Sequence, residues 1–260
     1  MDLERHAVCD VSRRPGVGAA RRGSFRGVGG AVAASPASIL SGALTGWWDD
    51  GSATMTGASW TNRTGGTAFT QGTGGLQPAT GTAINGRPTL QTDGVDDRMD
   101  AASVATLYTT SAFCLWMVVR PLGVLIAGPP VGTATRCFAT DVGGYTAAGC
   151  ATDARGITFD TNYDITTTPG VMSTGTVYQI RLRLDAGTLY YRLRNSGGTV
   201  GEGSVVAGNL GGGGALRFGT DYLAANGQSF DVGAIVTANA APSAGQLSAM
   251  DAWTFGKWGV

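Results

Sequence analysis

The chain has 260 residues, no formal net charge, and a charged set of 17 Arg, one Lys, 16 Asp and two Glu. The shortage of Lys and Glu argues against a mainly helical protein, and 43 Gly favour short strands joined by turns. Zero net charge argues against binding nucleic acid through bulk charge, and a single His removes most His-dependent catalysis.

An arginine-rich segment opens the chain. Residues 1–40 hold six arginines against three acidic residues, separated mainly by Gly and Ala, without a hydrophobic period. This composition predicts an extended N-terminal arm with an excess of positive charge. The arginines are Arg5, Arg13, Arg14, Arg21, Arg22 and Arg26. The segment lacks the apolar core of a secretory signal, and no apolar run in the chain is long enough to span a membrane.

Residues 41–260 have the pattern of one all-β domain. Short apolar runs alternate with segments rich in Gly, Thr, Asn and Asp, a spacing typical of sandwiches and barrels. The expected strands are Arg87–Thr92, Ala112–Arg120, Arg136–Thr140, Gly156–Asp160, Val177–Leu184, Thr188–Arg194, Val200–Val206, Ala215–Gly219 and Phe230–Thr237.

The clearest local pattern is a hairpin over residues 177–194. Every second residue from Ile180 to Leu184 is apolar, and the alternation resumes after the triplet Asp185–Gly187. The triplet predicts a three-residue loop with Gly187 in the left-handed conformation. One face of the hairpin therefore belongs to the core, and the other faces solvent or a partner.

One short helix is expected near the C-terminus. Ser243 is suited to cap its start, and Leu247, Met250 and Trp253 follow at helical spacing. Gly259 is expected to end the helix, because Gly adopts the left-handed conformation that stops helices.

Three stretches of sequence, in order, point to a family. They are Leu44–Asp49 (LTGWWD), Ile84–Met99 (INGRPTLQTDGVDDRM) and Phe230–Gly259, which ends in KWG. Together they resemble the concanavalin A-like lectin/glucanase superfamily, in particular the LamG-like jelly rolls of bacterial and phage proteins. The resemblance covers roughly residues 41–260 and implies an antiparallel jelly-roll β-sandwich. Thr92 stands where this family often has Phe, which changes the packing of one strand but leaves the turn after it intact.

The residue set argues against catalysis. Glycoside hydrolysis on this fold needs two facing carboxylates, and the glucanase branch of the superfamily carries an E-x-D-x-E strand. The chain has only Glu4 and Glu202, neither of them in such a motif. His6 lies in the arm, where it cannot complete a Ser-His-Asp or Cys-His set. We therefore expect a protein that is not an enzyme.

The four cysteines have no C-x-x-C spacing, which argues against a zinc site. Cys114 lies in an apolar run and is expected to be a core thiol. Cys137 and Cys150 flank a Gly-rich segment, and they either form a disulfide or remain reduced.

Calcium is the one ion for which the sequence offers candidate ligands. Asp93, Asp96 and Asp97 supply hard oxygens in the D-G-x-D-D segment, although Ca²⁺ needs six to eight of them. The alternative is that these carboxylates build the turn by accepting nearby backbone N–H groups. No other cofactor is expected.

Two surface groups are candidates for binding. The outward positions of the hairpin form a possible docking patch for an acidic surface or an anionic glycan, or else a solvated face with nearby Asp residues. Its members are Arg181, Arg183, Arg192 and Arg194. Aromatic residues in polar loops are possible sugar-stacking groups, or else plugs of the core. They are Trp60, Tyr145, Tyr163 and Tyr222.

A non-enzymatic structural or binding protein fits these features best. The leading hypothesis is a phage virion component, a capsid decoration or tail-associated subunit whose arm anchors it to other subunits of an oligomeric assembly. It would assemble in the host cytoplasm, without a membrane or nucleic-acid partner. The alternative is a carbohydrate-binding adhesin that recognises host surface glycans. A cryptic glycosidase and a nucleic-acid-binding arm are further possibilities that the residue set disfavours.

Overall fold

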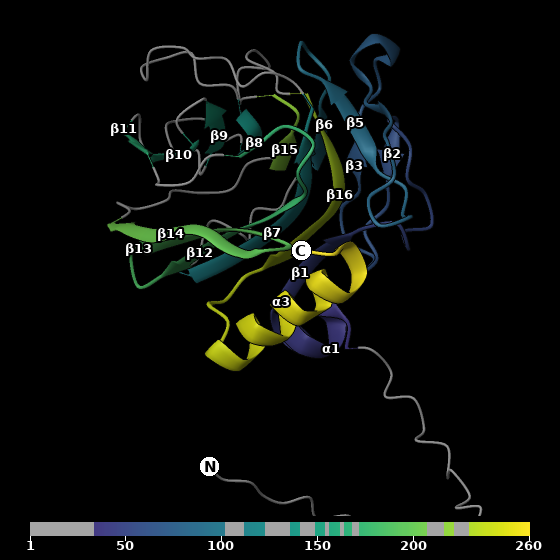
Figure 1. The fold of residues 1–260 in the computed structure, drawn as a ribbon. Helices are drawn as coiled ribbons and strands as arrows, with labels where there is room; N and C mark the ends of the chain where they lie inside the picture. The colour runs from purple at the N-terminus through teal and green to yellow at the C-terminus, as the bar shows by residue number, and fades with distance from the viewer. Residues whose placement is uncertain are drawn as a thin grey trace, which may run out of the picture. The chain divides into compact units, whose positions relative to one another are not determined.

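A computed structural model describes residues 34–101, 112–122, 136–140, 149–153, 156–161, 164–167, 172–206, 216–220 and 229–260 (Figure 1). The chain divides into two units, Met1–Ala33 and Ala34–Val260, and the fold given below is that of the second unit. The boundary expected at residue 40 lies earlier, because Pro36–Leu40 forms a helix whose Leu40 is buried. The arginines of the expected arm lie outside the described residues.

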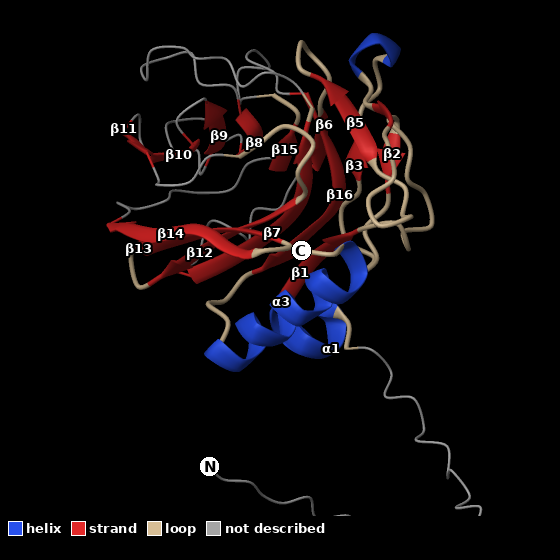
Figure 2. Cartoon of the chain, viewed as in Figure 1, coloured by secondary structure: helices blue, strands red, loops and turns tan. Residues whose placement is uncertain are grey.

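Two antiparallel sheets form the expected β-sandwich (Figures 1 and 2). Sheet A has the order β14-β13-β12-β7-β16-β5-β4, with β1 paired to β16, and sheet B has the order β11-β10-β9-β8-β15-β6-β3-β2. Sheet A contains β1 (Leu44–Trp48), β4 (Ala79–Thr80), β5 (Leu90–Asp93), β7 (Ala112–Pro121), β12 (Tyr178–Asp185), β13 (Thr188–Asn195), β14 (Gly198–Val206) and β16 (Ser229–Ala238). Sheet B contains β2 (Ser59–Trp60), β3 (Phe69–Thr70), β6 (Met99–Ala101), β8 (Arg136–Thr140), β9 (Gly149–Asp153), β10 (Gly156–Thr161), β11 (Asp164–Thr167) and β15 (Leu216–Phe218).

The main core lies between the two sheets. Strand alternation buries Ile180, Leu182 and Leu184 of β12 in it, as the hairpin pattern predicts. The ring of Phe69 lies 4.8 Å from that of Trp48 and 5.1 Å from that of Phe218, measured between ring centroids. The first of these contacts joins the two sheets, because Trp48 lies on β1 of sheet A and Phe69 on β3 of sheet B.

The hairpin loop is one residue shorter than expected. Asp185 pairs with Thr188, so only Ala186 and Gly187 form the loop, with φ of 48° and 79°. Two consecutive positive φ values are typical of the type I′ turn, whose twist matches that of the strands. Gly187 adopts the left-handed conformation as predicted, and Ala186 adopts it as well.

Two helices cover the outer face of sheet A. They are α1 (Pro36–Leu40) and α3 (Ala244–Trp258), and the short 3-10 turns are η1 (Ser41–Ala43) and η2 (Gly74–Leu76). Trp116 of β7 is buried against Leu40 and Met250, so β7 is buried on both faces. The C-terminal helix is confirmed: Ser243 forms a capping box with Gln246, and Gly259 ends the helix at φ 80°. Within the described part of the chain, no helix has the length and apolar character needed to cross a membrane.

Candidate functional site

The three stretches that resemble the family meet at Lys257, in the last turn of α3. Its Nζ lies 2.6 Å from Asp49 Oδ2 and 2.5 Å from Asp50 Oδ1. Its backbone carbonyl accepts hydrogen bonds from Asn85 Nδ2 and Arg87 Nε, each 3.0 Å long. We name this group the Lys257 junction; its charged members are Asp49, Asp50, Arg63, Arg87 and Lys257.

Asp49 is the fully buried centre of the junction. Trp47 Nε1 donates to its Oδ2 at 2.7 Å, and the Gly51 N–H donates to its Oδ1 at 2.8 Å. Arg63 Nη1 lies 2.9 Å from the same Oδ1. A buried carboxylate is costly unless charges and donors surround it, and here both oxygens have them.

Asp50 shares its cations with Asp49. Burial alone would raise the pKa of Asp50, but hydrogen bonds from Lys257 and Arg87 outweigh it and lower that pKa. Arg87 Nη1 lies 2.7 Å from Asp50 Oδ2. The junction therefore joins β1, the Asn85–Gly86 turn and α3 through charge-balanced contacts.

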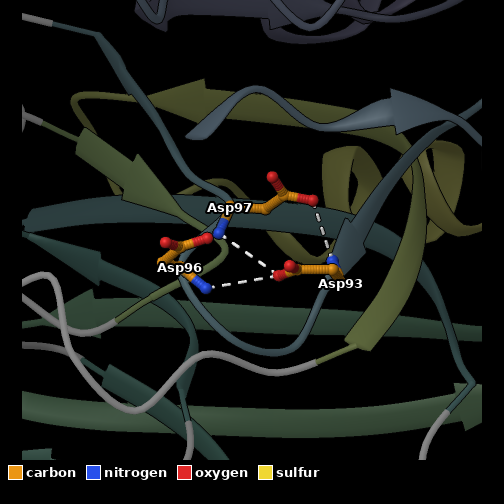
Figure 3. A group of neighbouring side chains, drawn as sticks. All are labelled: Asp93, Asp96 and Asp97. Carbon is orange, nitrogen blue, oxygen red and sulfur yellow. Dashed lines mark hydrogen bonds between the residues drawn. The ribbon is translucent and has the colours of Figure 1, made fainter. Parts of the chain in front are cut away.

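The Asp93–Asp97 turn brings the three calcium candidates together (Figure 3). Asp93 Oδ1 accepts hydrogen bonds from the backbone N–H groups of Val95, Asp96 and Asp97, at 2.8, 3.2 and 3.3 Å. Asp97 Oδ2 accepts one from the Asp93 N–H at 2.9 Å. One oxygen of each carboxylate lies within 4.8 Å of the others. These hydrogen bonds are those expected if the carboxylates build the turn.

The turn concentrates negative charge. Burial and the neighbouring Asp93 charge raise the pKa of Asp97 to about 6. A cation would reduce this repulsion, but Ca²⁺ needs six to eight oxygen ligands. Among the described residues no further His, Cys or acidic side chain joins the group. Calcium binding therefore stays a prediction.

The arginine patch is partly covered by α3, so it is neither a fully open docking surface nor a fully solvated face. Asp251 of the helix forms ion pairs with Arg192 and, at 3.7 Å, with Arg181. Arg192 Nη2 also donates to Gln179 Oε1 at 3.1 Å. Only 15% of the Arg181 side chain and 13% of the Arg192 side chain is exposed, so these two arginines hold the helix against the sheet.

The other two arginines of the patch stack on aromatic rings. The guanidinium of Arg183 lies 4.3 Å from the ring centroid of Tyr190, and that of Arg194 lies 5.8 Å from Phe255. Tyr190 is 38% exposed and Phe255 is 50% exposed. The accessible part of the patch is thus two separate arginine–aromatic pairs.

Of the two possibilities for Trp60, the structure favours a plug of the core over a sugar-stacking residue. It is fully buried in the core, and its Nε1 donates to the Asp49 carbonyl at 3.1 Å. The three tyrosines of that prediction lie outside the described residues.

An ion pair on sheet B was not anticipated. Arg217 Nε lies 2.5 Å from Asp100 Oδ1, and Arg217 Nη2 lies 3.0 Å from Asp100 Oδ2. The residues on either side point into the core, so this pair lies on the outer face of sheet B. Those buried neighbours are Met99, Ala101, Leu216 and Phe218.

The remaining candidates add no reactive group to these sites. Cys114 is buried, as expected, and burial raises the pKa of its thiol far above the usual range. Cys137 and Cys150 lie on the neighbouring strands β8 and β9, and their side chains lie outside the described residues. Glu202 is exposed on β14, opposite Arg192 in register.

Comparison with known proteins supports the fold. No family model matches the sequence, and a search of curated proteins finds no significant match. Trypanosoma rangeli sialidase in complex with sialic acid matches with a TM-score of 0.59 and 13% identity, over 82% of this chain and 33% of that one. Domain 4 of an extracellular arabinanase from Geobacillus stearothermophilus, in complex with arabinotriose, matches with a TM-score of 0.53 and 13% identity, over 80% of this chain and 97% of that one.

A third match is an α-L-arabinofuranosidase, with a TM-score of 0.51 and 13% identity, over 75% of this chain and 50% of that one. This chain spans about a third of the length of the sialidase. At these identities the matches show a shared β-sandwich fold, consistent with the concanavalin A-like resemblance.

Proposed function

We propose that the β-sandwich is a non-catalytic carbohydrate-binding module. The observation that carries the proposal is the match to arabinanase domain 4, which covers 97% of a domain whose structure holds arabinotriose. A likeness to one whole domain supports a binding role more directly than a likeness to a part of an enzyme. Within the resembled superfamily, we assign the chain to the LamG-like branch.

We place the sugar site on the outer face of sheet B, around Asp100 and Arg217. Arg217 offers planar donors and Asp100 offers acceptors, and sugar hydroxyl groups need both. The Asp100 side chain is 32% exposed. In the sequence, Tyr222 follows Arg217 by five positions, and an aromatic ring is suited to stack on a sugar.

Titration of the full chain with arabinotriose and with sialic acid, followed by NMR or calorimetry, tests this site. We expect saturable binding at millimolar sugar or below that weakens about tenfold in Tyr222→Ala and in Arg217→Met. Tyr190→Ala is the matched control, because Tyr190 lies on sheet A, outside the proposed site. Absence of binding to both sugars and on a broad glycan array would contradict the proposal, as would equal losses in both tyrosine variants.

A second proposal concerns assembly. The arginine excess of residues 1–40 favours a virion component whose arm binds acidic surfaces of neighbouring subunits through charge-assisted hydrogen bonds. Deletion of residues 1–33 leaves α1 and Leu40 in place, so the body is expected to fold as before. Loss of particle incorporation with an unchanged melting temperature is the expected result. A truncated chain that still assembles would rule out the anchor.

A further inference from the structure

The only lysine of the chain places its amine between two carboxylates. The exposed fraction of the Lys257 side chain is 14%, that of Asp50 is 12%, and that of Asp49 is zero. The Lys257 Nζ is within hydrogen-bonding distance of both aspartates, at 2.6 and 2.5 Å. A primary amine is therefore held beside a carboxyl group from which water is excluded.

The use of lysine is specific to this site. Every other ion pair between described side chains has an arginine as its cation. Arginine suits a buried ion pair at least as well, because its planar guanidinium binds both oxygens of a carboxylate. Arginine, however, stays protonated, whereas the amine of a lysine is a nucleophile once it has given up a proton.

We propose that Lys257 and Asp49 condense into an intramolecular isopeptide bond, with Asp50 as the group that transfers protons. The Lys257 ammonium first passes a proton to Asp49 Oδ2, which leaves a neutral amine beside a carboxylic acid. The Nζ lone pair then attacks Asp49 Cγ, so that the C–N bond forms and the C=O π electrons move to Oδ1.

Collapse of this tetrahedral species completes the reaction. Asp50 takes a proton from the nitrogen and delivers it to the Asp49 Oδ2 hydroxyl, which leaves as water when the C–O bond breaks. The electron pair on Oδ1 restores the carbonyl. An ammonium and a carboxylate have become an amide and one water, without an oxidant, a reductant or a co-reactant.

The contacts of Asp49 suit this chemistry. Negative charge develops on Oδ1, where the Gly51 N–H at 2.8 Å and Arg63 Nη1 at 2.9 Å are already directed. Fixed donors at such a position stabilise the transition state of acyl transfer. The leaving oxygen, Oδ2, carries the contacts to Lys257 and to Trp47 Nε1, and Arg63 Nη1 also reaches it at 3.2 Å.

Indole rings surround the reacting pair. The ring centroids of Trp253 and Trp258 each lie 5.6 Å from the Lys257 Nζ. The Lys257 side chain is only 14% exposed, so bulk water has little access to the reacting pair. The product would link Asp49, the residue after β1, to the last turn of α3. Residues 49–257 would then lie within one covalently closed loop.

Intact-mass spectrometry of the full chain, folded at neutral pH and then denatured, tests the proposal. We expect a mass one water below that of the sequence, and a tryptic product in which the peptide with Asp49 is joined to the one with Lys257. The unmodified mass after prolonged incubation would show a permanent ion pair and overturn the proposal. This readout is independent of the carbohydrate proposal.

Two variants separate the roles. Lys257→Arg keeps the positive charge but cannot form the amide, so it is expected to keep the full calculated mass. Asp50→Asn is expected to slow the loss of water about 100-fold, as for removal of a proton-transfer group. Conversion of a folded Asp50→Asn variant at the wild-type rate would refute the role of Asp50, and circular dichroism verifies its fold.

Discussion

The Lys257 junction and the Asp93–Asp97 turn both bury aspartates, but in opposite electrostatic surroundings. Asp49 is fully buried, and Arg63 and Lys257 lie on its oxygens. Asp97 is 8% exposed, and its close charged neighbour is the carboxylate of Asp93. The pKa of Asp97 is accordingly raised to about 6, whereas that of Asp50 in the junction is lowered.

The difference shows that the charges around a buried acid, more than its burial, determine what it does for the fold. In the junction each carboxylate holds two distant segments together, so removing it affects several elements at once. In the turn the carboxylates organise only a local loop. Their mutual repulsion is unfavourable, and the hydrogen bonds from backbone N–H groups reduce it. The following predictions test this contrast.

The largest effect is expected from Asp49→Ala. The substitution leaves Lys257, Arg63 and the Trp47 N–H without their buried acceptor and also prevents the proposed amide; breaking the ion pair alone costs about 3–5 kcal/mol. Urea unfolding measures the loss. Asp185→Ala is the control, because its contact with Arg183 is exposed and 3.9 Å long, and we expect about 0.5 kcal/mol or less there. Similar losses in the two variants would remove the contrast.

Asp251→Ala tests whether the arginine face behaves like the junction. Arg181 and Arg192 would lose their shared carboxylate beneath α3, which we expect to cost about 2–3 kcal/mol in the same assay. Asp251→Asn retains an acceptor and is expected to lose less. An Asp251→Ala variant as stable as wild type would show that α3 is held by its apolar face alone.

The sequence predicts the long elements well, because period and capping are visible over eight or more residues. The hairpin β12–β13, the strand β16 and the helix α3 are examples. The strands β2 and β3 have only two residues each, which is too short for an alternation of apolar and polar residues to be recognised. The Asp100–Arg217 pair was missed for the same reason. Each residue lies between two buried neighbours, but in strands of only three residues, where such alternation is not a reliable signal.

The junction shows what could not be predicted. Asp49 and Lys257 are 208 positions apart, and no local pattern connects them. The three stretches that carry the resemblance were visible in the sequence. Their convergence on Lys257 was not. The sequence pattern placed the hairpin arginines on the correct face of the sheet. It could not show that α3 covers two of them, because Asp251, which pairs with Arg181 and Arg192, lies on a distant element.

Asp97→Asn is expected to stabilise the fold, whereas the two substitutions above destabilise it. With a pKa near 4 in the unfolded chain and about 6 when folded, Asp97 binds more protons in the folded state between these values. The contribution of Asp97 to the free energy of unfolding of the wild type therefore falls as the pH rises from 4 to 6, and it remains low above pH 6. The variant should exceed wild type by about 2 kcal/mol at pH 8, with the gain vanishing near pH 4. Thermal unfolding between pH 4 and 8 measures this difference, and a variant less stable than wild type at pH 8 would contradict it.

Calcium is expected to produce the smallest effect. The Asp93–Asp97 turn supplies three carboxylates, and oxygens of two of them already accept backbone N–H groups, so few of the six to eight ligands that Ca²⁺ needs are at hand. We expect 5 mM CaCl₂ to change the melting temperature by about 1 °C or less, and by no more than 5 mM MgCl₂. With so few ligands the Kd for Ca²⁺ is expected to lie well above this concentration, where linkage stabilisation is small. A saturable rise with Ca²⁺ alone, lost in Asp96→Asn, would instead make the turn a cation site.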